Sequence, residues 1–173
     1  IDNLVYAVMN AFYIACSSFV GQNYGAGKAD RVRKSYLLTL AYSAFVAGFF
    51  GMLFLLFGRE FLSLFTSESA VIDAGLERIR IMCFVFPLSA LMDDTTAAAR
   101  GIGKGLVPMI FVFLGSCVFR VIWIYTVFAY FHTISSLYLL YPFSWIITGA
   151  AEIFYFLYSY KKIVVPLGAS RKA

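Results

Sequence analysis

Five long apolar runs, separated by short polar segments, dominate the pattern of hydrophobic and polar positions along the chain. Each is roughly 20–26 residues long, enough for a helix to cross about 30 Å of hydrocarbon with some tilt. The sequence lacks the strict alternation over ~10-residue stretches that a transmembrane barrel requires. Helices close their backbone hydrogen bonds within the segment. The pattern therefore predicts an all-α, polytopic transmembrane helix bundle with spans at residues 3–22, 35–57, 79–99, 106–131 and 137–160.

The composition excludes an ordinary soluble domain. Of the 173 residues, 62% are hydrophobic and 13% are charged, whereas soluble domains average about 45–50% apolar and about 25% charged residues. The net charge of +5 does not indicate nucleic-acid binding, because the basic residues are spread over the segments between apolar runs. No Ser-His-Asp, Cys-His or HExxH arrangement is present. We expect no enzymatic activity, no cofactor and no structural metal.

The basic residues orient the predicted bundle. Ten of them follow the first, third and fifth runs, where alternating helices emerge on one side: Lys28, Arg31, Arg33, Lys34, Arg100, Lys104, Lys161, Lys162, Arg171 and Lys172. The positive-inside rule places that side in the cytoplasm. We therefore expect a multi-pass protein of the cell membrane, with a transmembrane unit at residues 1–162 and a cytoplasmic tail at 163–173. Its first span then starts outside without a leader, which predicts the C-terminal part of a longer protein.

The segment between the second and third runs predicts a short helix on the outer interface. Ser67 is its expected N-cap, with acidic residues near its start and basic residues near its end. Pro87 lies inside the third run, where a proline kinks a helix, so it is a candidate hinge. Pro142 is expected in the first turn or two of the fifth span.

Four charged residues lie within the predicted spans: Asp93, Asp94, Arg120 and Glu152. At 1.5 Å per residue they share a slab near the middle of the bilayer, about 17–22 Å from the outer ends of their helices. Each costs roughly 2.5–3.5 kcal/mol when it faces lipid at a helix centre. We therefore expect them to face one another or a wet cavity.

Two roles for these charges remain open. In the first, Arg120 forms an ion pair with an aspartate, and this pair only aligns the helices. In the second, one of the carboxylates binds a cation or a proton on a transport pathway. Neighbouring helical residues point about 100° apart. We therefore expect one of Asp93 and Asp94 to pair with Arg120 and the other to face a cavity as the ion-coupling residue. Glu152 and Asn10 are further candidates for a cavity or an interhelical contact.

Two glycine-containing segments occupy matching positions after the first and third runs, at residues 21–28 and 101–105. Neither is a phosphate-binding loop, because both lack the GK[ST] ending and a preceding strand. Glycines at helix ends instead permit tight turns and close helix approach.

Together with other short motifs, these segments resemble the multidrug and toxic compound extrusion (MATE) transporters. The first motif is VGQNYGAGK at residues 20–28, followed by two arginines. The others lie at residues 64–81, at residues 99–103 (ARGIG, with alanine where the family usually has leucine) and at residues 141–145 (YPFSW). The motif positions are Gly21, Gln22, Asn23, Gly25, Ala26, Arg100, Gly101 and Gly103.

The resemblance implies helices eight to twelve of a twelve-helix protein with two lobes. It implies efflux of amphipathic, often cationic organic compounds in exchange for Na⁺ or H⁺, by alternating access between the lobes. Asp93, seven residues before Arg100, corresponds to a functional carboxylate that some members carry on the tenth helix. The implied partners are small organic substrates, membrane lipid and the N-terminal lobe of the same protein, and no nucleic acid.

Two other functions remain as alternatives. A lipid-linked sugar flippase of the same exporter superfamily would share the helix count, but its cavity should carry more basic residues for phosphate. A membrane scaffold that transports nothing is disfavoured by the clustered charges within the spans.

Overall fold

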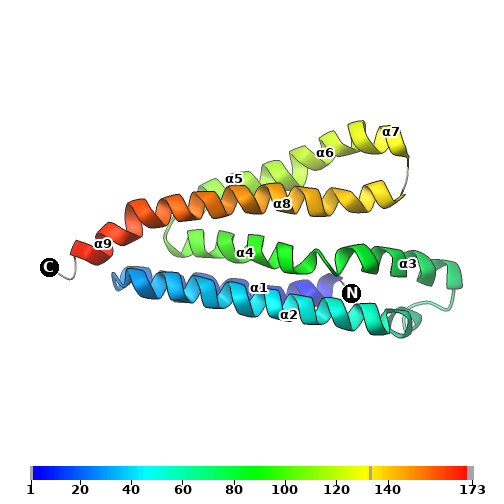
Figure 1. Ribbon diagram of the computed structural model, residues 1–173, viewed down its shortest axis with the longest axis horizontal. Coiled ribbons are helices and arrows are strands. Elements are labelled where there is room, and N and C mark those ends of the chain that lie inside the picture. Colours follow the sequence, from blue (N-terminus) through cyan, green and yellow to red (C-terminus); the bar gives the residue numbers. More distant parts are fainter. Residues whose placement is uncertain (1, 133, 171–173) are drawn as a thin grey trace.

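The structure is a computed structural model and describes residues 2–132 and 134–170. Every regular element in these two ranges is helical, which confirms the all-α class. Figure 1 shows long helices lying roughly side by side in an elongated bundle. Along the chain they are α1 (Asp2–Gly25), α2 (Ala29–Ser63), α3 (Ser69–Met82), α4 (Phe86–Gly101), α5 (Leu106–Phe113), η1 (Leu114–Val118), α6 (Phe119–Trp123), η2 (Ile124–Phe128), α7 (Ala129–Phe131), α8 (Ile134–Ser159), η3 (Tyr160–Val164) and α9 (Val165–Ser170).

Several of these elements join end to end into longer rods. The segments α5 to α7 alternate α-helical and π-helical turns over the predicted fourth span, and α8, η3 and α9 continue the fifth into the expected tail. Within the described ranges, four helices are long and apolar enough to cross a membrane: Asn3–Gly25, Ala29–Ser63, Leu106–Phe128 and Ser136–Ala169. Pro142 lies inside α8, beyond its first two turns, because that helix begins earlier than expected.

The predicted third span is divided into two helices. Residues 83–85 separate α3 from α4, and Pro87 lies in the first turn of α4. A proline suits the first turn, where its missing N–H is not needed, and it disfavours helix in the residue before it. The break packs closely on α2, since a Cβ added at Gly51 would lie 2.8 Å from the carbonyl oxygen of Cys83. The predicted distortion is therefore a complete break just before the proline.

The outer helix α3 is longer than expected and begins one residue later. Its N-cap is Glu68, so Ser67 as the N-cap is wrong. The backbone N–H of Glu68 donates to Thr66 Oγ1 at 3.2 Å, which stabilises the turn that precedes the helix. An exposed ion pair of 3.5 Å between Arg59 and Asp73 joins α2 to α3.

The helix α4 forms the centre of the bundle. In Figure 1 it lies between α1 and α2 on one side and α8 on the other. Ten of its residues are buried: Phe86, Ser89, Ala90, Met92, Asp94, Thr95, Thr96, Ala97, Ala98 and Ala99. Two apolar clusters pack around it, one near the α3 end with Met9 and Trp145, and one near the opposite end with Cys16 and Phe156.

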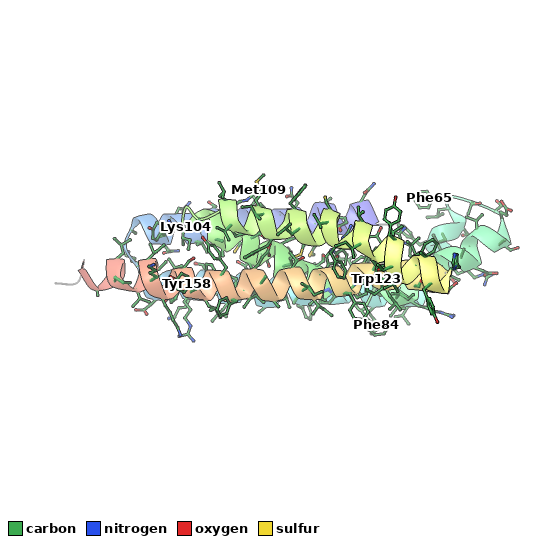
Figure 2. The ribbon with its side chains drawn as sticks, turned by 90° about the horizontal axis from the view of Figure 1, so that it is seen from above. Phe65, Phe84, Lys104, Met109, Trp123 and Tyr158 are labelled. Carbon is green, nitrogen blue, oxygen red and sulfur yellow. The ribbon has the colours of Figure 1, made fainter. Side chains whose placement is uncertain are left out.

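The outer surface is apolar, as a lipid-facing surface must be. Phe65, Phe84 and Met109 are 73%, 78% and 62% exposed, and Figure 2 shows them at the periphery of the bundle. The basic segments lie together at one end, because the α1–α2 connection and α9 line one pocket and the α4–α5 connection lies at the same end in Figure 1.

Candidate functional site

A central polar layer separates the two apolar clusters around α4. On α4 and α8 its residues fall between those of the two clusters, at mid-length of the bundle. We use this name for Thr39 and Ser43 of α2, Asp93, Asp94, Thr95 and Thr96 of α4, and Thr148 and Glu152 of α8. All but Asp93 are buried. A layer of buried polar groups inside an apolar bundle marks the place where function is to be sought.

Asp93 is the aspartate that faces a pocket. Together with Tyr6, Met9, Asn10 and Tyr13 of α1 it lines a cavity of about 240 Å³. The α1 residues recur at spacings of three and four, so one face of that helix forms the wall. Asn10 is exposed rather than packed between helices of this chain, which favours its candidacy as a cavity residue.

Asp94 points to another side of α4, into the core. It is 1% exposed, and one carboxylate oxygen accepts a short hydrogen bond from the Ser43 hydroxyl of α2. The Cys16 thiol of α1 lies 3.5 Å from the Asp94 backbone carbonyl. The consecutive aspartates are therefore separated as the 100° turn predicts: Asp93 faces the pocket and Asp94 holds helices together.

Arg120 pairs with neither aspartate, so the expected ion pair is wrong. Its guanidinium lies 4.7 Å from the centre of the Tyr141 ring, and its Nε and Nη2 are each 3.4 Å from Ser144 Oγ. Both partners are on α8. The rod α5–α7 packs on α8 and not on α1 or α2 (Figure 1), so α8 separates Arg120 from the faces of α4 that carry the aspartates.

Glu152 lies completely buried between α8 and α4. It is 0% exposed, and its Oε1 accepts a hydrogen bond of 2.8 Å from Thr96 Oγ1. Its Oε2 has no hydrogen-bond partner among residues 2–132 and 134–170. The negative charge of Asp93 acts on Glu152 electrostatically.

The sequence pattern did not single out the hydroxyl groups in and beside this layer. Tyr36 and Thr95 share a hydrogen bond of 2.9 Å between α2 and α4, and Ser43 and Thr96 each donate to a carboxylate. One sequence signal could have found them, namely the run of polar residues 93–96 inside an otherwise apolar span. An uncharged polar side chain within a span needs an internal partner, because lipid supplies none.

The two glycine motifs meet where α1 crosses α4. A Cβ added at Gly21 would lie 3.4 Å from the Gly101 carbonyl oxygen, and one added at Gly101 would lie 2.8 Å from that of Ser17. Small residues allow two helix backbones to approach this closely. Gly103 has φ of 74°, a left-handed conformation that glycine adopts without strain at a helix end. The expected tight turn and close approach are thereby confirmed.

The remaining motif residues fasten the same end of the bundle. Asn23 Nδ2 lies 2.8 Å from the Phe19 carbonyl oxygen and 3.2 Å from Ser35 Oγ, which links α1 to α2. Gln22 is exposed and reaches only Ser18. The Arg100 guanidinium lies 5.6 Å from the centre of the ring of Tyr13, a residue of the pocket. Gly25 and Ala26 lie at the exposed end of α1 and its turn.

The comparisons with known proteins agree with these motifs. A protein-family model described as MatE matches residues 1–126, more than two thirds of the chain. The chain belongs to the MatE family. The family predicted from the motifs is thereby confirmed.

A solved structure supports the fold of this MatE chain. It is described as the inward-facing conformation of a multidrug resistance MATE family transporter of the MOP superfamily. The TM-score is 0.69 at 19% sequence identity, with 94% of this chain and 39% of that chain covered. The chain therefore spans about two fifths of the length of that transporter. No curated protein matches the chain.

Proposed function

We propose that the chain forms part of the C-terminal lobe of a transporter that extrudes amphipathic, often cationic organic compounds by antiport with Na⁺ or H⁺. The two lobes alternate access to the two sides of the membrane, and Pro87, beside the break between α3 and α4, is the bend point. The membership in the MatE family and the fold support this proposal.

The observation that carries the proposal is the position of Asp93 at a pocket beside tyrosine rings. A carboxylate next to aromatic faces attracts organic cations, through charge and through cation–π contact. The pocket of about 240 Å³ is small beside ligand sites of ~300–1,000 Å³. It serves as one wall of a larger cavity that the other lobe completes.

Exchange follows if a coupling ion and a cationic substrate compete for the same carboxylate. A Na⁺ or H⁺ at Asp93 neutralises a charge within the membrane and favours one arrangement of the helices. A cationic drug neutralises the same charge when the ion leaves. We propose that the protein lies in the cell membrane with its C-terminus in the cytoplasm, an orientation that the ten basic residues on one side support.

The experiment is ion-gradient-driven efflux of a cationic dye by the full-length protein in proteoliposomes. Asp93→Asn removes the charge but keeps the size of the side chain, so we expect dye efflux to fall by about tenfold or more, within the usual range of coupling free energies, with normal expression. Glu60→Gln, at an exposed position of α2, is the matched control and should transport normally.

Undiminished efflux by Asp93→Asn removes Asp93 from the mechanism, and a failure of that variant to fold assigns it a structural role instead. The flippase alternative is tested in the same vesicles with a lipid-linked sugar. The position of Arg120 disfavours a flippase, because this mid-membrane cation contacts Ser144 and Tyr141 and not the pocket.

A further inference from the structure

Within residues 2–132 and 134–170, the buried carboxylate of Glu152 has no counter-charge. Thr96 of α4 donates one hydrogen bond to Oε1, while Oε2 is unpartnered within the described part of the chain. An ionised carboxylate that is fully buried in this way is strongly unfavourable. The site therefore needs a positive charge that binds to the unpartnered oxygen, Oε2.

The geometry around Glu152 favours a proton over a metal ion. A hard cation needs several oxygen ligands, whereas Glu152 is 0% exposed and offers one unpartnered oxygen. The pocket that Asp93 lines is not lined by Glu152. A proton on Oε2 needs neither a cavity nor further ligands to remove the charge.

Asp93 connects Glu152 to the pocket. Asp93 and Thr96 are three residues apart on α4, so they lie on the same face of that helix. Thr96 in turn contacts Glu152, and Asp93 interacts electrostatically with it. A proton that enters the pocket thus meets Asp93 first, on the helix face that also carries Thr96, the hydrogen-bond partner of Glu152.

The other titratable groups around Glu152 do not neutralise it. Tyr13 of α1 and Tyr36 of α2 interact with it electrostatically, and neither carries a positive charge. Arg120, the charged group on the rod α5–α7, contacts Ser144 and Tyr141 instead. Arg100 lies over the Tyr13 ring. Asp93 is the acidic group whose charge acts on Glu152.

We propose that Glu152 is a second proton-binding residue of this lobe, loaded through the pocket at Asp93 and discharged when a cationic substrate occupies that pocket. The proton moves from Asp93 to Glu152 Oε2 and returns by the same route, so that no bond other than O–H forms or breaks. The inference rests on the proposed antiport and names its coupling ion at this site as a proton.

Infrared spectroscopy of the purified full-length protein tests the proton directly. A protonated carboxyl group has its own carbonyl stretch, and we expect a buried band of this kind to disappear in Glu152→Gln. Glutamine keeps the size of the side chain and an oxygen that accepts the bond from Thr96. Thr96→Val keeps the carboxyl group but removes its donor, so the same band should shift in frequency, which tests the assignment even if Glu152→Gln fails to fold.

Proton release on binding of ethidium, a cationic dye, tests the coupling. We expect the wild type and Glu60→Gln to release protons when the dye binds, and Glu152→Gln to bind the dye but release about half as many, because Asp93 is then the remaining proton-binding residue of the pair. Glu152→Asp should restore part of the release.

An unchanged band and unchanged release in Glu152→Gln would overturn the inference. A lost band with unchanged release also overturns it, because the proton is then only structural. If instead the wild type transports no dye but the band is lost in Glu152→Gln, the proposed transport function fails while the proton site at Glu152 stands.

Discussion

At the scale of single residues, position on a helix decides the role of a charge. Asp93 and Asp94 are neighbours with the same chemistry, yet one lines a pocket and the other is buried against Ser43. The sequence alone predicted that the two would point in different directions, because the helical turn is about 100° per residue. It did not predict which faces the pocket, since that depends on how α4 is rotated against α1 and α2.

The burial of Asp94 leads to a prediction for its hydroxyl partner. Ser43→Ala leaves a buried carboxylate without its hydrogen-bond donor, and we expect the protein to lose about 1–3 kcal/mol of stability. Thermal unfolding in detergent measures the loss. Ser18→Ala, at an exposed position of α1, should change stability by less than about 0.5 kcal/mol. Equal melting temperatures of Ser43→Ala and the wild type would show that the hydrogen bond between Ser43 and Asp94 does not stabilise the protein.

At the scale of elements, the lengths of the helices follow the apolar runs, while their ends and breaks follow tertiary contacts. The run at residues 79–99 is continuous in the sequence, but the break at residues 83–85 packs against Gly51 of α2. Pro87 indicated that the helix would be distorted near it. The contact with α2 could not be predicted from the third run, because the residue that it meets lies in another helix.

The crossing of α1 and α4 yields a prediction for its glycines. A Cβ at Gly101 meets the Ser17 carbonyl oxygen at 2.8 Å, whereas a Cβ at Gly25 meets nothing within 4 Å. We therefore expect Gly101→Ala to destabilise the protein by about 1–3 kcal/mol through overpacking, and Gly25→Ala to be close to neutral. Melting temperatures of the two variants in the same detergent make the comparison. If Gly101→Ala has the same melting temperature as the wild type, the two helices can move apart without loss of stability, and the prediction is wrong.

At the scale of the whole molecule, the bundle has an apolar outer surface, one basic end and a polar layer at mid-length. The two apolar clusters hold the ends of the helices together. The polar layer between them holds the carboxylates of the spans. An ion that binds there can therefore favour one arrangement of the helices over another.

The orientation of the bundle can be tested with single cysteines. In a background where Cys16, Cys83 and Cys117 are replaced by alanine, Ser67→Cys should react with a membrane-impermeant thiol reagent in intact cells. Lys104→Cys, at the basic end, should react only after the membrane is permeabilised, because basic ends remain in the cytoplasm. The reverse labelling pattern would contradict the proposed topology.

The order of apolar runs, the all-α class, the basic end, the MatE motifs and the charged residues within the spans could all be recognised from the sequence, because each depends on composition or on short-range spacing. The partners of those charges could not. Thr96 contacts Glu152 across 56 positions of the chain, and Ser43 contacts Asp94 across 51. Helix rotation and packing bring these groups together, and helical periodicity carries no information on which helix a given face will meet. For the same reason Arg120 lies over Tyr141 rather than beside an aspartate.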